Sequence, residues 1–128
     1  MPKVLISDVL SKSAVATFLK YGVEVNYQPT WGKNPNKLIK NIEHYDGLTV
    51  RSSTLVTKLL IDKALKLKVI GRAGIGIDNI DLPSASSKGI VVMNTPFGNS
   101  ITTAEHTIAM LLSVARQIPE AHISTSSG

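Results

Sequence analysis

Two arginines that follow short apolar runs are the side chains best suited to bind a ligand. Arg51 comes directly after Leu-Thr-Val and precedes two serines and a threonine, and Arg72 comes after Val-Ile-Gly and precedes Ala-Gly-Ile-Gly. A guanidinium group binds carboxylate or phosphate through paired hydrogen bonds. The neighbouring hydroxyl groups and glycine backbone could add further donors. These two segments therefore predict a binding site for a small anionic molecule.

Five strand-like runs, separated by helix-like stretches, would position these segments. We predict strands at residues 4–7, 23–27, 46–50, 67–71 and 90–93. We predict helices at residues 11–20, 36–42, 54–65 and 82–88. Such alternation is typical of an α/β fold with right-handed crossovers and a parallel sheet that has helices on both faces. Because the second strand alternates like a half-buried edge strand, we expect the flavodoxin-like order 2-1-3-4-5.

In that order the carboxyl ends of strands one, three and four lie next to one another. Asp8 follows strand one, Arg51 follows strand three and Arg72 follows strand four. Ligands of open parallel sheets bind beyond these ends, where the strand order reverses, so we expect both guanidinium groups in one crevice. Each residue also has an ordinary structural interpretation. An arginine at a strand end is usually solvated, and Ser52, Thr54 or Asp8 could simply cap a helix.

The glycine-rich segment 71–79 has part of a dinucleotide-binding fingerprint. From Gly74 it reads G-x-G-x-x-N, so Asn79 stands where the third glycine would be. The acidic residue expected about twenty positions later is missing, because Asn94 lies in that region. The helix predicted after it is also short. We therefore reject this segment as the main cofactor site and expect its glycines to let the backbone approach a ligand closely.

Several kinds of catalytic and metal site are excluded by composition. The chain contains no cysteine, which rules out a disulfide framework, a thiolate metal site and a cysteine nucleophile. His44, His106 and His122 are scattered along the sequence. No cluster of histidines or carboxylates has metal-ligand spacing, so we identify neither a metal site nor a catalytic residue within these 128 residues.

The charge and hydropathy of the chain disfavour nucleic acid and membrane as partners. Fourteen lysine and arginine residues against nine acidic residues give a net charge of +5, but no basic block accompanies the single tryptophan. The longest apolar runs are far shorter than a membrane span, and the N-terminus does not resemble a signal peptide. We therefore expect a cytoplasmic protein whose ligand is a small anion.

The C-terminal part differs from the rest of the chain. Residues 99–119 predict a long helix with a capping box at 102–105, a continuous apolar face and an end at Pro119. Residues 120–128 are mainly polar, and we expect a linker or a cut end there. No further βα unit follows, so the sequence predicts a portion of a larger protein. The apolar face predicts self-association, as a homodimer through residues 100–118.

Five segments, taken together and in this order, resemble the D-isomer-specific 2-hydroxyacid dehydrogenases. They are 51–54 (RSST), 71–81 (GRAGIGIDNID), 93–100 (MNTPFGNS), 104–105 (AE) and 115–119 (ARQIP). The similarity extends from about Val4 to the end of the chain and is greatest to the branch of that family that oxidises phosphoglycerate. Several spaced motifs make this resemblance far more specific than the isolated glycine pattern.

The resemblance implies a two-domain enzyme that uses NAD. It assigns residues 1–98 to a flavodoxin-like substrate-binding domain, and residues 99–119 to a crossover helix of the nucleotide-binding domain that also contributes to a dimer interface. It implies that Arg51 and Ser52 bind the anionic groups of the substrate, with Arg72 a weaker candidate for the same role. It assigns five further positions: the backbone of Ala73 and Gly74 to the substrate carboxylate, Ile75 and Gly76 to the vicinity of the nicotinamide, and Asn99 to the vicinity of the substrate.

In members of that family the dinucleotide fingerprint, the catalytic histidine–glutamate pair and an active-site arginine come later in the chain, as does a segment that returns to complete the substrate domain. None of these has a counterpart here, so we expect this chain alone not to transfer hydride. Three alternatives stay open: a sister activity such as glyoxylate or hydroxypyruvate reduction, a flavodoxin-like module of the flavin-binding or receiver type, and a non-catalytic domain that self-associates.

Overall fold

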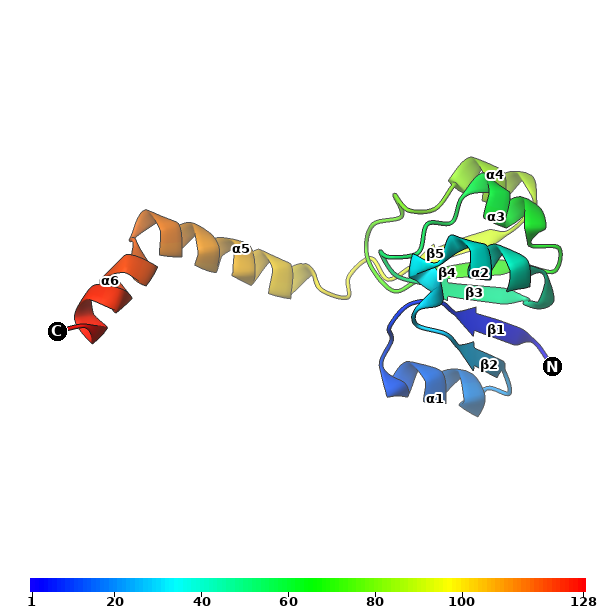
Figure 1. Ribbon diagram of the computed structural model, residues 1–128, viewed down its shortest axis with the longest axis horizontal. Helices are drawn as coiled ribbons and strands as arrows, with labels where there is room; N and C mark the ends of the chain where they lie inside the picture. The colour runs from blue at the N-terminus through cyan, green and yellow to red at the C-terminus, as the bar shows by residue number, and fades with distance from the viewer. The chain divides into compact units, whose positions relative to one another are not determined.

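The chain forms two units, residues 1–96 and 97–128, in a computed structural model that describes residues 1–128. The first unit is built on five short strands (Figure 1). They are β1 (Lys3–Ile6), β2 (Glu24–Tyr27), β3 (Gly47–Val50), β4 (Val69–Arg72) and β5 (Val91–Asn94). All neighbouring strands are parallel, in the order β2-β1-β3-β4-β5. The predicted flavodoxin-like sheet is therefore confirmed.

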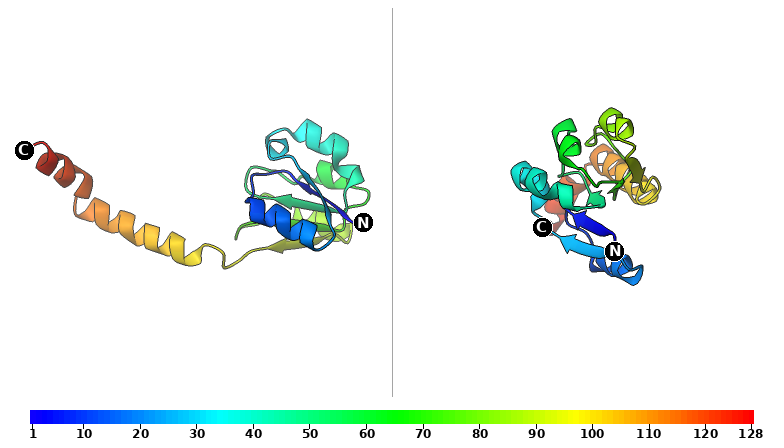
Figure 2. Two further views of the ribbon diagram at one scale, coloured as in Figure 1. Left: turned by 90° about the horizontal axis from the view of Figure 1, so that it is seen from below. Right: turned by 90° about the vertical axis from the view of Figure 1, so that its right-hand side faces the viewer.

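Four helices cover the two faces of the sheet. In chain order they are α1 (Lys12–Lys20), α2 (Pro35–Asn41), α3 (Lys58–Lys63) and α4 (Leu82–Ser87). Two short 3-10 helices, η1 (Trp31–Lys33) and η2 (Ile42–His44), flank α2. Helix α1 lies on one side of the sheet, and α2, α3 and α4 lie on the other (Figures 1 and 2). Helices on both faces are thus confirmed as well.

The hydrophobic core lies between the sheet and the side that carries α2, α3 and α4. The strands contribute side chains that are almost fully buried: Leu5, Leu48, Val50 and Ile70. The helical segments on this side contribute Leu38, Ile42, Leu60, Ile61 and Ala85. Complete burial of one large aliphatic side chain stabilises a fold by about 1.5–3 kcal/mol. This single layer therefore dominates the stabilisation of the first unit.

Local capping residues explain where most of these helices begin and end. Ser11, the first residue of the predicted helix 11–20, caps α1 through its side chain. Asn34 caps α2, so this helix begins one residue before the predicted start at residue 36, and Pro35 occupies the first helical position, where a missing N–H is tolerated. Gly22 and Gly89 follow α1 and α4 at φ values of 71° and 69°, the left-handed conformation that commonly ends a helix at glycine.

Helix α3 begins at Lys58, four positions later than the predicted start at residue 54. Thr57 is its N-cap, and its side chain accepts a hydrogen bond from the backbone N–H of Leu60. The preceding residues are committed to other contacts. The backbone N–H of Val56 donates to the carbonyl of Asn79 at 2.9 Å, within an isolated parallel bridge. A residue paired in this way cannot also form the first turn of a helix.

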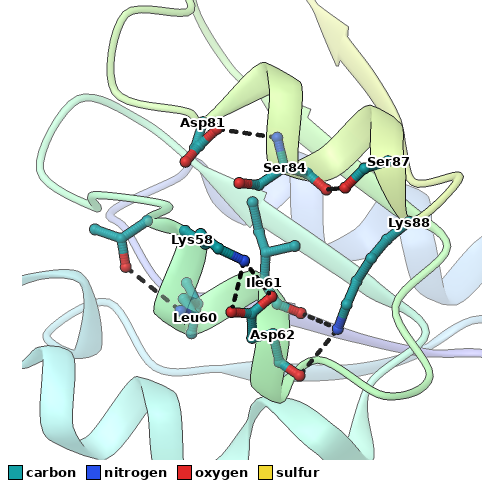
Figure 3. A network of polar contacts seen from close by, with 9 residues as sticks. Lys58, Leu60, Ile61, Asp62, Asp81, Ser84, Ser87 and Lys88 are labelled. Atoms are coloured by element: carbon teal, nitrogen blue, oxygen red, sulfur yellow. Dashed lines mark hydrogen bonds and ion pairs between the residues drawn. The ribbon is translucent and has the colours of Figure 1, made fainter.

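A polar network ties α3 to α4 (Figure 3). Lys88, just after α4, donates from Nζ to the carbonyl oxygens of Ile61 and Asp62 at 2.8 and 2.9 Å. Both carbonyls belong to the last turn of α3, where intrahelical donors run out. That of Ile61 also accepts from the backbone N–H of Ala64 at 3.1 Å, whereas that of Asp62 has no backbone donor. Lys58 and Asp62 form an exposed ion pair of 3.0 Å on the same helix. The network therefore completes the C-terminal end of α3 with a positive charge, which the helix dipole also favours.

The second unit consists of α5 (Ser100–Ala115) and α6 (Ile118–Ser126). The helix predicted over residues 99–119 is therefore divided, because Gln117 adopts a left-handed conformation with φ 49°. The predicted capping box at 102–105 is wrong, since Asn99 is the N-cap and 102–105 lie inside α5. Residues 120–126, within the segment where a linker or a cut end was expected, are helical, because α6 continues to Ser126. Pro119 begins this helix instead of ending the previous one.

None of the helices is long and apolar enough to cross a membrane. The longest, α5, has 16 residues, fewer than the roughly 20 that a spanning helix needs. No group of three histidine or acidic side chains is arranged so that it could hold a metal ion.

Candidate functional site

The loop that follows β3 is held in place by a buried carboxylate. Asp8, just beyond β1, is only 1% exposed. It accepts hydrogen bonds from the backbone N–H of Arg51 at 2.6 Å, from the hydroxyl of Thr54 at 2.8 Å, and from the hydroxyl of Ser53. The hydroxyls of Ser7 and Thr54 also lie 2.9 Å apart. Asp8 and Thr54 are therefore not helix caps, since they fasten the loop to the end of β1.

A buried asparagine holds the same loop from the other side. Asn79 lies between β4 and α4 and is 8% exposed. Its Nδ2 donates to the carbonyl oxygens of Arg51 and Thr54, both at 2.7 Å. These two bonds fix the orientation of the amide, and its Oδ1 has no hydrogen-bond partner. The loop backbone is thus held on two sides, while the side chains of Arg51 and Ser52 remain exposed.

A cavity of about 460 Å³ lies at the carboxyl ends of β1 and β3. The strand order reverses between these two strands, which is the usual ligand position in an open parallel sheet. The cavity is lined by residues from the loops after β1, β2 and β3: Asp8, Val9, Pro29, Thr30, Lys33, Arg51, Ser52 and Ser53. The structure therefore brings Arg51 and Ser52 together at the edge of the sheet where the sequence analysis expected them.

Arg72 does not line this cavity. Its guanidinium group faces its own loop, where Nη1 donates to the carbonyl oxygen of Gly76. A Cβ atom added at Gly74 would lie 3.0 Å from the same Nη1, so the loop passes close to the guanidinium at this glycine. Arg72 and Ala73 line a separate groove of about 360 Å³ beside α1. The expectation that both guanidinium groups share one crevice is therefore wrong.

The glycine-rich loop does not form a dinucleotide site. The pyrophosphate of a dinucleotide binds at the N-terminus of a helix that follows the glycines directly. Here Asn79 engages the preceding loop instead, and α4 has only six residues. Asn94 donates from Nδ2 to the carbonyl of Ile75 at 2.7 Å, which joins the loop to β5. The backbone N–H groups of Ile75 and Gly76 have no acceptor within the chain and remain available to a ligand.

Asn99 belongs to the second unit, where it is the N-cap residue of α5. Its side chain makes no capping hydrogen bond, although its carbonyl accepts one from the backbone N–H of Thr103 at 2.9 Å. The predicted site residues therefore fall into three groups. Arg51 and Ser52 line the cavity, residues 72–76 form the glycine-rich loop, and Asn99 begins α5.

Lys33 and Asn79 were not identified as site residues in the sequence analysis. Lys33 lies in the connection between the predicted strand 23–27 and the predicted helix 36–42, to which no role was assigned, and Asn79 was interpreted only as a replacement for glycine. One signal was present for Lys33. A loop that leaves β2, the neighbour of β1, must start at the same edge of the sheet as the loops after β1 and β3. Its charged residue was therefore a candidate for the same cavity.

Comparison with known proteins places this geometry in a family. Residues 4–127 match the D-isomer specific 2-hydroxyacid dehydrogenase family, catalytic domain. The chain is 44% identical to a D-3-phosphoglycerate dehydrogenase of Archaeoglobus fulgidus and 47% identical to one of Sus scrofa. In both cases the match covers 98% of this chain, but only 24% and 23% of the relative. The chain thus spans about a quarter of the length of these relatives.

Solved structures agree with the sequence comparison. A crystal structure of a Thermus thermophilus protein superposes with a TM-score of 0.87 and 31% identity, over 98% of this chain and 40% of that one. The NAD+-bound 3-phosphoglycerate dehydrogenase of Entamoeba histolytica gives a TM-score of 0.76 and 33% identity, over 88% of this chain and 38% of that one. The family match extends over nearly every residue. The chain therefore belongs to the D-isomer-specific 2-hydroxyacid dehydrogenases.

Proposed function

We propose that this chain is the substrate-binding portion of an NAD-dependent D-3-phosphoglycerate dehydrogenase. The reaction oxidises the 2-hydroxyl group of 3-phosphoglycerate to the ketone of 3-phosphohydroxypyruvate, the first step of serine synthesis. The observation that carries the proposal is a cavity lined by Arg51 and Ser52 at the strand-order switch, in a chain 44–47% identical to relatives with that name. A cationic cavity suits a substrate that carries both a carboxylate and a phosphate.

Within this proposal the residues of the chain orient the substrate and neutralise its charge. Arg51 and Ser52 bind an anionic group, because both side chains are exposed and line the cavity. The backbone N–H groups of Ala73 and Gly74, expected to bind the carboxylate, already donate to the carbonyls of Val50 and Arg72. Those of Ile75 and Gly76 are free and suit contacts with the nicotinamide edge. Arg72 acts indirectly, by holding this loop in shape. Orientation of this kind accelerates a reaction without any proton transfer by the orienting groups.

The cofactor and the proton-transfer group belong, in this proposal, to residues outside the chain described. The 128 residues contain no fitting dinucleotide loop, so we expect them alone to show no hydride transfer. We assign residues 99–119, including Asn99, to the nucleotide-binding domain, and we propose a homodimer through residues 100–118. Large apolar side chains of α5 are more than half exposed and would be covered in such a dimer: Ile101, Ile108, Leu111, Leu112 and Val114. We further propose a cytoplasmic protein that binds neither membrane nor nucleic acid.

An open face of the sheet supports the proposal that a further segment completes the first unit. On the α1 side, Val91 and Met93 of β5 are 57% and 55% exposed. Met93 also lines the groove beside α1, together with Leu10 and Phe18. Both faces of a parallel sheet are normally covered. A segment of the longer protein is the expected cover for this face.

The experiment that tests the proposed function uses the full-length protein. NADH formation from NAD and 3-phosphoglycerate is compared with NADH consumption on hydroxypyruvate and on glyoxylate. We expect kcat/KM to be highest with the phosphorylated substrate pair. We also expect Arg51→Ala to raise KM for 3-phosphoglycerate at least tenfold, roughly the loss of one charge-assisted contact, while KM for NAD stays within about twofold of the wild-type value.

Three results would contradict the proposal. A preference for glyoxylate or hydroxypyruvate over the phosphorylated pair would identify a sister reductase of the same family instead. Equal effects of Arg51→Ala on 3-phosphoglycerate and NAD would show that this arginine does not bind the substrate. Absence of any dehydrogenase activity, together with formation of a stable dimer, would favour a non-catalytic domain that self-associates.

A further inference from the structure

A short turn after β2 brings a second positive charge to the cavity. The turn is η1, and its last residue, Lys33, lines the cavity together with Arg51. The turn is fixed on both sides. The backbone N–H of Gly32 donates to the carbonyl of Ser7 at 2.9 Å, and the side chain of Asn34 caps α2. Lys33 lies between these two fixed points, so its backbone is held beside the loops after β1 and β3.

Gly32 is the residue that allows this approach. It is buried, and a Cβ atom added to it would lie 2.7 Å from the Oδ1 of Asp8 and 3.0 Å from the carbonyl oxygen of Ser7. It would also collide with the hydroxyl of Thr54. Any larger residue would therefore push the turn away from the strand ends, and Lys33 would move with it.

Neither cation of the cavity is neutralised within the chain. Lys33 forms no ion pair, and Arg51 forms none either. The Nη1 of Arg51 donates to the carbonyl of Val9 at a long 3.4 Å. The one carboxylate in the cavity lining, Asp8, is already engaged by one backbone N–H and two hydroxyls. Two unpaired cations in one concave site attract a ligand with more than one negative group.

We propose that Lys33 binds the phosphate of the substrate and thereby determines the preference for a phosphorylated 2-hydroxy acid. This proposal rests on the proposed function, since it divides the two anionic groups of that substrate between two cations. The guanidinium of Arg51 suits paired hydrogen bonds, while the ammonium of Lys33 acts as a compact point charge that phosphate binds well. A substrate without phosphate has no group for Lys33 to bind.

A pair of substrates that differ only in the phosphate isolates this contact. The full-length enzyme reduces 3-phosphohydroxypyruvate or hydroxypyruvate with NADH, and steady-state constants are measured for both. The variants are Lys33→Gln, Lys33→Arg and a matched control, Lys37→Gln. Lys37 is an exposed lysine of α2 that does not line the cavity.

For Lys33→Gln we expect KM for the phosphorylated keto acid to rise by about tenfold or more, the usual effect of losing one charge-assisted contact. KM for hydroxypyruvate and KM for NADH should stay within about twofold of the wild-type values. The value of kcat should also stay within about twofold, because the lost contact binds the substrate and the transition state equally. Lys33→Arg should restore much of the affinity for phosphate. Lys37→Gln should behave as the wild type on both substrates.

The outcomes separate this inference from the proposed function. If the wild type prefers the phosphorylated substrate and Lys33→Gln retains that preference, the inference about Lys33 is wrong and the proposed function stands. Equal losses on both substrates would also overturn the inference, since they would indicate a general structural effect. If the wild type itself shows no preference for the phosphorylated substrate, the proposed function fails before Lys33 is considered.

Discussion

Replacement of Asp8 by alanine should destabilise the fold far more than its replacement by asparagine. In Asp8→Ala the part-buried backbone N–H of Arg51 and two hydroxyls lose a charged acceptor. An unsatisfied buried group costs about 1–3 kcal/mol, and a lost hydrogen bond to a charged group about 1.5–3 kcal/mol. The hydroxyl of Thr54 can turn to Ser7, which lies 2.9 Å away, and the exposed Ser53 can turn to water. We therefore expect a loss of about 2–4 kcal/mol of unfolding free energy, mainly from the N–H of Arg51 and the lost charged acceptor.

Asparagine preserves most of this geometry. Its oxygen can accept from the backbone N–H of Arg51 and from Thr54, and its amide can donate to the hydroxyl of Ser53 after that group rotates. These hydrogen bonds lose only the extra strength that a charged acceptor gives them. Asp8→Asn should therefore lower the unfolding free energy by about 1 kcal/mol. The difference between the two variants measures how much the acceptor contributes apart from its charge.

The assay is urea denaturation of the 128-residue chain, followed by circular dichroism and analysed by linear extrapolation with the slope m compared among variants. Asp62→Ala is the matched control. Asp62 forms an exposed ion pair with Lys58, and such pairs contribute about 0–1 kcal/mol. Our reasoning about the loop would be refuted if Asp8→Ala destabilised the chain no more than Asp62→Ala does, with an unchanged m.

Three further predictions concern other residues. Asn79→Ala should lower the unfolding free energy by about 2–4 kcal/mol, because one buried and one part-buried carbonyl lose their donor. Asn79→Asp should destabilise the chain more at neutral pH than in mild acid, since a buried carboxylate facing two carbonyls folds better when protonated. Gly32→Ala should cost about 1–3 kcal/mol through overpacking, measured by the same denaturation. A hydrogen bond and charge attraction from Glu24 raise the pKa of Lys3. The wild type should therefore be more stable than Lys3→Met at neutral pH, and this difference in unfolding free energy should vanish only when the pH rises beyond about 10.5. Denaturation curves of both proteins over a series of pH values measure the difference.

The sheet was predictable because its signals are local. Each strand is a short β-branched or aliphatic run, and each predicted strand overlaps the observed one. The alternation in 23–27 correctly marked β2 as an edge, which decided the strand order. The predicted bounds of the first helix, 11–20, also agree closely with α1, because its cap, Ser11, and the left-handed Gly22 that follows it depend only on neighbouring residues.

The start of α3 could not be predicted for the opposite reason. Ser52 and Thr54 look like N-cap residues, but the hydroxyl of Thr54 is bound to Asp8, 46 positions away in the sequence. A serine or threonine hydroxyl serves a local cap or a distant partner equally well. Only the packed strand order decides between them, and here it favours the distant carboxylate. Helix α3 is consequently shorter than its apolar spacing suggests.

The position of Arg72 illustrates a similar limit for the site. Arg51 and Arg72 both follow strands that end at one edge of the sheet, which is why the sequence analysis placed them together. In the structure Arg72 donates to the carbonyl of Gly76, whereas Arg51 donates to the carbonyl of Val9 and lines the cavity. Strand order determines which loops meet, whereas the direction of a long side chain depends on which acceptors its own loop supplies.

The buried charge of Asp8 explains how an anion-binding cavity tolerates a carboxylate in its lining. A carboxylate near an anionic ligand opposes binding unless its charge is offset. Asp8 faces only donors, and the two unpaired cations, Lys33 and Arg51, leave the lining with one net positive charge. The carboxylate therefore acts on the backbone of Arg51 and leaves its side chain free. A neutral residue in place of Asp8 would give a more positive cavity. It would, however, hold the loop after β3 with weaker hydrogen bonds, and the position of Arg51 would be less well defined.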